Sequence, residues 1–327
     1  MTLLAIFLIS GLSVAALTPL LIGLANRCGW LAPPEARSMH QAPIPSGGGL
    51  VMAIVVIGAM VSYALPHGLI LGAALVALVG FIDDVRPLPI LPRLICQACA
   101  VGLGWFAIGG WSEWHDGESV YRLAPALQVI VGIACLWFLN LYNFMDGLDG
   151  LAGSELLFVA LVAALLSPSI ELRAIWLALA GAAAGFLFWN RPPARIFMGD
   201  AGSGFIGFLV GLMLVWSVAR REFSVWTAII LVAPFVADAS VTLLRRIVAG
   251  EPWYRPHVSH AYQHLARRWG SHGRVVLAFG AVNVALVLPA AWWAESRPDF
   301  APVLAVALLA VLSVVAFVAG AGRRGES

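Results

Sequence analysis

The chain has 327 residues, of which 61% are hydrophobic and only 11% are charged. A soluble domain of this length keeps far more charge on its surface, so the composition indicates a membrane protein. The formal net charge of +2 is too small to favour a nucleic-acid-binding protein. All nineteen basic residues are arginines. Arginine suits paired hydrogen bonds to phosphate, but a compositional bias of the genome explains the preference equally well.

The first apolar run extends from Leu3 to Ala25 with no basic segment ahead of it. It can cross ~30 Å of hydrocarbon as a helix, so we expect a membrane span rather than a cleaved signal peptide. Further apolar segments cover residues 47–65, 69–83, 91–110, 124–143, 151–167, 172–189, 204–219, 224–247, 275–294 and 301–320. The sequence therefore predicts an all-α, polytopic membrane helix bundle. It has about eleven transmembrane helices in a single integral membrane domain, residues 1–327.

The arginines divide unevenly between the two sets of loops that this topology creates. Fourteen lie in the loops on the side of Arg27, and five lie in the opposite loops. The positive-inside rule places the richer set in the cytosol. We therefore expect the N-terminus outside and the C-terminus inside.

Six aspartates map to the cytosolic ends or interiors of the predicted helices. A carboxylate near hydrocarbon costs on the order of several kcal/mol unless it is paired or bound to a metal. Single ones often cap a helix or pair with arginine, but six on one side, from four segments, favour a functional site. They are Asp83 and Asp84 in GFIDDVRP, Asp146 and Asp149 in NLYNFMDGLDGLAG, Asp200 in RIFMGDAGSG, and Asp238 within the ninth segment.

The spacing of these polar residues indicates a metal site. Asn140, Asn143 and Asp146 recur every three residues, so they span a polar arc of ~120° at the end of the fifth helix. Adjacent Asp83 and Asp84 must point in different directions, so one can face a metal and the other a substrate. Oxygen ligands of this kind suit Mg²⁺ or Mn²⁺ rather than zinc.

Glycines and cysteines add weaker signals. The glycines that flank the acids permit tight turns whose backbone N–H groups can face an anion. The run Gly47–Gly49 fits either a loop that a phosphate approaches or the start of a close-packed helix. The GxGxxG at residues 202–207 is not a dinucleotide motif, because no strand precedes it. Cys96 and Cys99 form a CxxC inside a predicted membrane helix, which favours packing over redox or zinc chemistry.

The loop at residues 248–274 contains GEPWYRPHVSHAYQHLARRWG. Its His257 and His260 are three residues apart and would face one site if the segment were helical. Arg255 lies beside them, whereas Arg267 and Arg268 also fit an amphipathic segment that faces lipid headgroups.

Another cytosolic loop, RSMHQAPIPSGGG, carries Arg37 and His40. Acids for a metal, together with arginines and histidines for phosphates, indicate phosphoryl transfer at the bilayer surface.

Five motifs occur in one order along the chain, and together they resemble those of a known family. They are RSMHQAPIPSGGG, GFIDDVRP, NLYNFMDGLDGLAG, NRPPARIFMGDAGSGFIG and RPHVSHAYQH. From about residue 30 to residue 265 the chain resembles the polyprenyl-phosphate N-acetylhexosamine-1-phosphate transferases, or glycosyltransferase family 4. This superfamily includes the phospho-MurNAc-pentapeptide translocase.

The resemblance implies roles for the matching residues. Asp83 and Asp84 would supply a base that activates the lipid phosphate and a contact to metal or diphosphate. Mg²⁺ would be held by Asn143 and Asp200, with Asp146 close to it. The predicted catalytic residues are Asp83, Asp84, Asp146 and Asp200. The predicted substrate-binding residues are Arg37, His40, Asn140, Asn190, Arg255, His257 and His260.

The resemblance also implies the substrates. Undecaprenyl phosphate would attack the β-phosphate of a UDP-N-acetylamino sugar and release UMP. The active-site loops 26–46, 83–93, 140–153, 190–204 and 248–274 would lie at the cytosolic face of a bacterial inner membrane. The loop HVSHAYQH departs from the consecutive histidines and following acid of the peptidoglycan translocase. It looks more like the O-antigen-initiating branch, which puts a peptide-bearing MurNAc substrate in doubt.

Three rival functions make different predictions. A cation- or proton-coupled transporter needs carboxylates near helix centres, and only Asp238 fits that well. A scaffold leaves the clustered aspartates unexplained, and a CDP-alcohol phosphotransferase needs a compact run of spaced aspartates that is absent from the sequence. The sequence leaves open the sugar, the oligomeric state (a homodimer included), the division of roles between Asp83 and Asp84, and the role of Asp238.

Overall fold

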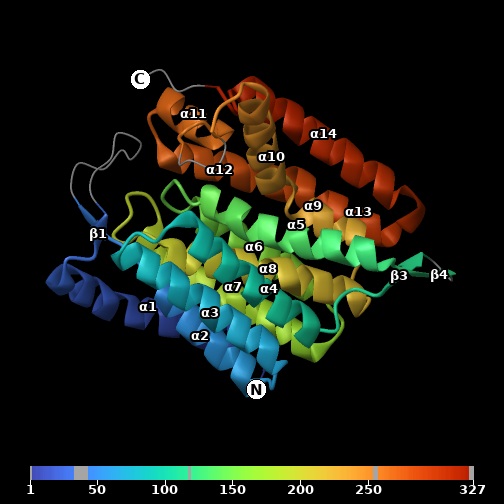
Figure 1. Ribbon diagram of the computed structural model, residues 1–327, viewed down its shortest axis with the longest axis horizontal. Helices are drawn as coiled ribbons and strands as arrows, with labels where there is room; N and C mark the ends of the chain where they lie inside the picture. Colours follow the sequence, from blue (N-terminus) through green and yellow to red (C-terminus); the bar gives the residue numbers. More distant parts are fainter. Residues whose placement is uncertain (1, 33–42, 117–118, 253–256, 324–327) are drawn as a thin grey trace.

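The computed structural model describes residues 2–32, 43–116, 119–252 and 257–323, and this part of the chain is almost entirely helical (Figure 1). The first elements are α1 (Leu3–Cys28), β1 (Leu31–Ala32), β2 (Ile44–Pro45), α2 (Gly49–Ser62), α3 (His67–Val85), α4 (Ile90–Ala107), β3 (Glu113–Asp116), β4 (Ser119–Arg122) and α5 (Pro125–Phe144). They are followed by α6 (Leu151–Leu166), α7 (Ile170–Asn190), α8 (Asp200–Ala219), α9 (Val225–Leu231) and α10 (Ala233–Val248). The last elements are α11 (Ala261–Trp269), α12 (His272–Val282), the π-helix η1 (Asn283–Val287), α13 (Leu288–Ser296), the 3₁₀-helix η2 (Pro298–Phe300) and α14 (Ala301–Ala319).

The predicted polytopic helix bundle is confirmed. Each of the eleven apolar segments contains a helix, and among the described residues eight spans are long and apolar enough to cross a membrane. The bent pair α9–α10 makes a ninth candidate, whereas α2 and α6 are apolar but have only 14 and 16 residues. Eleven crossings, and the orientation that depends on that number, therefore stay a prediction.

Two predicted spans are not single straight helices. The segment 224–247 bends by 71° between α9 and α10. Pro234, in the first turn of α10, cannot donate a backbone hydrogen bond to the preceding helix, so the chain restarts there. The segment 275–294 lies in one continuous span, His272–Ser296, which contains the π-helical turn η1 between α12 and α13. Neither the bend nor the π-helical turn shows in the hydropathy, because apolar residues continue through both.

Helix α8 is the centre of the bundle, and its residues from Ala201 to Leu214 are buried. It packs against α2, α3 and α5. The helices approach closely because the contacts are glycines: a Cβ on Gly49 would lie 2.0 Å from the Cα of Gly202. A Cβ on Gly80 would likewise lie 2.4 Å from the carbonyl oxygen of Asp200. These glycines hold the first turn of α8 against α2 and α3.

The same contact decides between the two interpretations of Gly47–Gly49. The N–H groups of Gly48 and Gly49 donate to the carbonyls of Phe197 and Met198 at 2.9 and 2.8 Å. These two amides are therefore engaged within the protein, which supports the close-packed helix start.

The ends of the bundle differ in what they carry. Figure 1 shows the β3–β4 hairpin at one end of the molecule and β1 at the other. At the β1 end, Phe197 donates to Pro45 of β2 at 2.8 Å, which places the segment before α8 there. The C-terminal end of α3 meets the first turn of α8 at the same end. The predicted aspartates and the histidine loop thus lie at the same end of the bundle.

Candidate active site

Asp84 of α3 caps α8 from outside that helix. Its two carboxylate oxygens accept from the N–H groups of Asp200 and Ala201, at 2.8 and 3.1 Å. First-turn amides have no partner within their own helix, and the helix dipole favours a negative charge at that position. Gly199, with φ +74°, lets the chain enter α8 against this carboxylate, where a Cβ would clash with Asp84. Asp84 therefore fixes the position of Asp200.

Asp83 points elsewhere, as its adjacency to Asp84 requires. It accepts a hydrogen bond from the N–H of Leu88 at 2.6 Å and forms an ion pair with the Arg93 guanidinium. The same guanidinium reaches Asp200 Oδ2 at 3.0 Å. Arg93 thus joins two of the predicted catalytic carboxylates. The Asp200 side chain keeps 31% of its surface exposed, so it remains accessible to a ligand.

A small pocket between α3, α4, α5 and α8 collects the polar groups beside Asp200. Arg93, Gln97, Asn143 and Asp200 line it, together with apolar residues and glycines of α3 and α8. Asn143 Oδ1 accepts from the Ser203 hydroxyl at 2.7 Å. The structure therefore brings the two predicted metal ligands, Asn143 and Asp200, to one pocket.

Asn140 lies one turn before Asn143 on α5. Its amide nitrogen donates to Gln97 at 3.1 Å and to the Leu136 carbonyl at 2.9 Å. This side chain is held toward α4, and its predicted contact with substrate stays a prediction.

Asp146 follows the end of α5 instead of continuing its polar face, because that helix ends at Phe144. Burial raises the pKa of Asp146 well above its usual range, and the charges of Asp200, Asp84 and Asp149 raise it further. A carboxyl group in such surroundings is neutralised by a proton or by a cation. The accumulated negative charge therefore fits a site that takes a cation.

The donor set also suits a particular kind of metal. Among the described residues, no three histidines, cysteines or acids converge as a preformed metal centre. Mg²⁺ commonly takes one or two protein oxygens and completes its shell with water and substrate phosphates. Asp200 and Asn143 on one pocket match that mode. Cys96 is half-buried and Cys99 is exposed on α4, both as free thiols, so the packing interpretation of the CxxC stays a prediction.

Asn190, at the end of α7, joins two loops of the site. Its amide nitrogen donates to the Ile196 carbonyl at 2.9 Å, and its oxygen accepts from the Gly150 N–H at 2.9 Å. The residue is only 3% exposed. Because both amide atoms are engaged and buried, this geometry favours a positioning role over the substrate contact that the resemblance implies.

Asp149 strengthens the same junction. It accepts from the Ala194 N–H at 3.0 Å and lies 3.3 Å from Nδ1 of His272, the first residue of α12. The acidic loop between α5 and α6 is thereby tied both to the loop before α8 and to α12.

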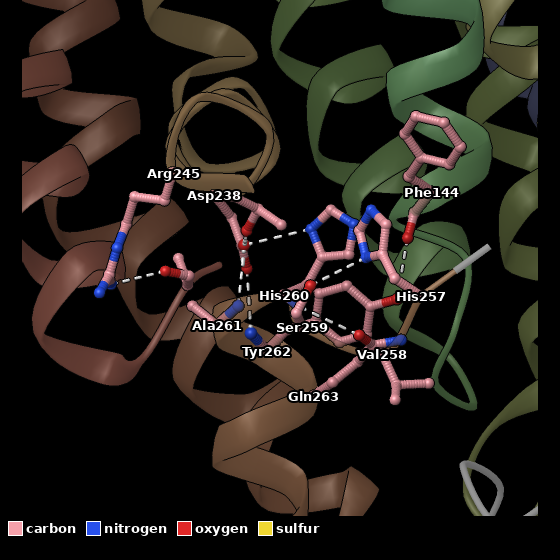
Figure 2. A network of polar contacts seen from close by, with 12 residues as sticks. Phe144, Asp238, Arg245, His257, Val258, Ser259, His260, Ala261, Tyr262 and Gln263 are labelled. Carbon is pink, nitrogen blue, oxygen red and sulfur yellow. Dashed lines mark hydrogen bonds and ion pairs between the residues drawn. The ribbon is translucent and has the colours of Figure 1, made fainter. Parts of the chain in front are cut away.

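The histidine loop is organised around Asp238 of α10 (Figure 2). The Asp238 carboxylate accepts from the N–H groups of Ala261 and Tyr262, both at 2.9 Å, and lies 3.3 Å from His260 Nδ1. It is 2% exposed. Asp238 therefore caps α11 and fixes His260, which answers the question of its role that the sequence left open.

His257 and His260 come together, but not through a helix. Both lie in the segment that precedes α11, and their rings stack with centroids 4.9 Å apart. The helical premise of the prediction is wrong, since His260 is the N-cap residue of α11. Burial, with smaller contributions from the neighbouring His260 and Arg246, lowers the pKa of His257 to about 4. At neutral pH His257 is therefore a neutral hydrogen-bonding group.

Tyr262 connects the histidine loop to the acidic loop. Its hydroxyl donates to the Phe144 carbonyl at 2.9 Å, and Gly147 leaves room for its ring. The Phe144 ring lies 6.1 Å from His257 and 6.3 Å from His260, centroid to centroid. The histidines therefore sit beside the segment that runs from Asn143 to Asp146.

Three predicted substrate-binding residues lie outside the described residues: Arg37, His40 and Arg255. Arg267 and Arg268 are exposed near the end of α11, where Arg267 donates to the Val258 carbonyl at 3.0 Å.

Sequence reasoning missed several residues that build the site. Arg93 is prominent, yet its only signal is an arginine inside an otherwise apolar run after a proline-rich turn. Gln97, Ser203 and His272 carried no signal, because each acts through a partner on another helix. Tyr262 could have been found from its position in the histidine motif.

Comparisons with known proteins agree with this geometry. The sequence profile described as "Glycosyl transferase family 4" matches residues 67–218. The chain is 30% identical to decaprenyl-phosphate N-acetylglucosaminephosphotransferase of Mycobacterium tuberculosis, over 84% of this chain and 81% of that protein. It is 28% identical to a probable undecaprenyl-phosphate N-acetylglucosaminyl 1-phosphate transferase of Bacillus subtilis, over 83% and 79%.

A third relative is phospho-N-acetylmuramoyl-pentapeptide-transferase of Moorella thermoacetica, 28% identical over 76% of this chain and 84% of that protein. The family profile covers α3 to α8, with the acidic loops around Asp83, Asp146 and Asp200. The chain therefore belongs to glycosyl transferase family 4, the polyprenyl-phosphate hexosamine-1-phosphate transferases.

Proposed function

We propose that this enzyme transfers an N-acetylhexosamine-1-phosphate group from a UDP-sugar to undecaprenyl phosphate and releases UMP. The observation that carries the proposal is the junction of two groups of residues at one end of the bundle. Asp83, Arg93 and Asp200 form the first group, and His257 and His260 form the second. The Tyr262–Phe144 hydrogen bond joins the histidine loop to the end of α5, whose Asn143 lines the pocket with Arg93 and Asp200. This connection supports a reaction between two phosphate-bearing substrates.

The reaction exchanges one phosphorus–oxygen bond for another. An oxygen of the lipid phosphate attacks the β-phosphorus of the UDP-sugar, and the bond from that phosphorus to the bridging oxygen breaks. UMP leaves with the bridging oxygen, so no redox partner or covalent enzyme intermediate is needed. Both reactants are anions, so the site must neutralise charge while it aligns them.

Mg²⁺, or Mn²⁺, is the proposed cofactor. Asp200 and Asn143 would hold it, and when bound it would neutralise phosphate charge. The support is the pair of oxygen donors on one pocket and the raised pKa of nearby Asp146.

Asp83 and Arg93 are proposed to handle the lipid phosphate. Asp83 would accept its proton or fix its position, since it is the acid whose oxygens are not committed to capping α8. The Arg93 guanidinium can donate to phosphate oxygens through its forked N–H groups when it leaves one carboxylate. His257 and His260 are proposed to bind the diphosphate of the nucleotide sugar through their ring nitrogens.

The choice of sugar follows the relatives. Two of them are named for N-acetylglucosamine and one for the muramoyl pentapeptide. The loop HVSHAYQH favours an unmodified or 6-deoxy N-acetylhexosamine over a peptide-bearing sugar. The product would start a lipid-linked O-antigen or related envelope polysaccharide, at the cytosolic face of a bacterial inner membrane.

The test is an assay of Asp83→Asn and Asp200→Asn with undecaprenyl phosphate. UDP-GlcNAc, UDP-FucNAc and UDP-QuiNAc are supplied in turn with Mg²⁺, Mn²⁺ or a chelator, and mass spectrometry identifies the lipid product. Loss of a group that stabilises the transition state should lower the rate by roughly 10²-fold or more. Glu171→Gln is the control, since Glu171 pairs with Arg220 away from the site. Transfer at the wild-type rate by both aspartate variants would refute the assignment.

A coupled transporter is the rival function, and the structure does not favour it. That interpretation depended on Asp238 as an acid near a helix centre. Both Asp238 oxygens are engaged by the first turn of α11, so the residue has a structural role without ion transport.

A further inference from the structure

A buried glutamate and a buried asparagine meet away from the acidic and histidine loops. Glu155 lies in α6, Asn283 is the first residue of the π-helix η1, and each is 2% exposed. Asn283 Nδ2 donates to Glu155 Oε2 at 2.6 Å. The remaining oxygens, Glu155 Oε1 and Asn283 Oδ1, are buried and have no hydrogen-bond partner within the described part of the chain.

An ionised Glu155 does not explain this arrangement. Within the described residues no arginine or histidine forms an ion pair with it, so a neutral amide would be the partner of a full charge in an apolar interior. The nearby Tyr142 hydroxyl cannot serve Oε1, since it donates to the Ala152 carbonyl at 2.6 Å. Glu155 Oε1 and Asn283 Oδ1 would then both remain buried acceptors without a donor within the described part of the chain.

One proton removes both defects. A protonated carboxyl group is a hydrogen-bond donor as well as an acceptor. With the proton on Oε1, Glu155 donates to Asn283 Oδ1 while the Asn283 amide donates to Oε2. The two planar groups then form a closed pair in which every buried polar atom is satisfied. The pair is electrically neutral, which suits a position surrounded by apolar helices.

We infer that Glu155 holds a proton in the folded protein and forms a neutral carboxylic acid–carboxamide pair with Asn283. This pair joins α6 to the π-helical turn between α12 and α13. The Asp149–His272 contact ties the α6 and α12 ends together at the acidic loop. Glu155 is thus a positioning residue for the loop that carries Asp146, and the inference does not depend on the proposed substrates.

Infrared difference spectroscopy tests the protonation directly. Spectra of wild type and Glu155→Gln are recorded at neutral pH in H₂O and D₂O, with Glu171→Gln as the matched control for an ionised, exposed glutamate. The expected difference is the carbonyl band of a protonated carboxylic acid that shifts in D₂O. If the Glu155→Gln spectrum instead lacks bands of an ionised carboxylate that wild type shows, Glu155 is ionised and the inference is overturned. The same result is expected if a water bridges Glu155 Oε1 and Asn283 Oδ1 and the carboxylate is ionised.

Variants provide a second, independent measurement. In Glu155→Gln the new side-chain amide can exchange two hydrogen bonds with Asn283, so this variant should fold and keep its transfer rate and melting temperature, within about two-fold in rate. Glu155→Asp is too short to close the pair, and Asn283→Leu removes its partner, so both should melt at lower temperature. A Glu155→Gln protein that fails to fold, or loses as much activity as Glu155→Asp, would contradict a neutral pair.

Discussion

Two regions of the molecule share one structural feature, a helix capped by an aspartate of another helix, but differ in what surrounds it. In each, an aspartate of one helix accepts hydrogen bonds from the first two amides of another: Asp84 caps α8, and Asp238 caps α11. Around Asp84 lie further acids and an arginine, and the side chain of the capped residue Asp200 is partly exposed. Around Asp238 lies His260, and the whole contact is buried.

A carboxylate in a membrane helix therefore need not be a ligand. Both carboxylate oxygens of Asp84, and both of Asp238, accept hydrogen bonds from backbone amides, so these two residues position other groups. Asp83 Oδ2 and Asp200 Oδ2 instead share the Arg93 guanidinium, a side-chain contact that a charged ligand can replace. The first region is therefore built to take charged reactants, and the second to hold a binding loop still.

The largest expected effect comes from Asp84→Ala. The substitution removes the cap of α8, so the free energy of unfolding should fall by about 1–2 kcal/mol. It also removes the contact that fixes the position of Asp200. A misplacement of about 1 Å can cost roughly 10²-fold in rate, so we expect kcat to fall by at least that factor. Steady-state assays and thermal melting in the same detergent check both parts. Stability lowered with kcat unchanged would show that Asp84 does not position Asp200.

Asp238→Ala should produce a different pattern. It strands two buried amides, so unfolding should become easier by about 1–3 kcal/mol, comparable with Asp84→Ala. Because Asp83, Arg93 and Asp200 stay in place, we expect KM for the proposed UDP-sugar substrate to rise about ten-fold with a smaller change in kcat. Asp238→Asn, which can still accept one bond, should fall between. A kcat loss equal to that of Asp84→Ala would erase the distinction between the two regions.

The smallest effect should follow from removing the contacts between the segment after α14 and the histidine loop. The Gly322 N–H donates to the Ser259 carbonyl at 2.7 Å, and Arg245 donates to the Ala321 carbonyl at 2.7 Å. Deleting residues 320–327 removes both contacts, each worth about 0.5–1.5 kcal/mol, so KM for the UDP-sugar should rise about two- to ten-fold. Deleting residues 324–327 alone is the control. Equal KM values for the two truncations would show that these contacts do not support the loop.

Much of the fold could be predicted from the sequence, because a membrane helix is indicated by the apolar residues of its own segment. Every apolar segment of about twenty residues became helical, and the acids fell at the segment ends as predicted. The bend at α9–α10 and the π-turn η1 were missed, since a proline or an altered hydrogen-bond pattern leaves the hydropathy unchanged. The histidines were predicted to face one site if their segment were helical; they stack without a helix, His260 held by Asp238 and His257 by Ser259.

The class of protein, the acidic and histidine motifs and the resemblance to the family could all be inferred from the sequence, because each depends on residues that are neighbours along the chain. Which acids cap a helix, and which keep a side chain that a ligand can reach, depends on contacts between helices that the sequence does not show. Asp84 and its amide partner are 116 residues apart, and Asp83 and Asp84 are indistinguishable as letters. Their roles separate because successive side chains on a helix point in different directions, and what each meets is supplied by other helices.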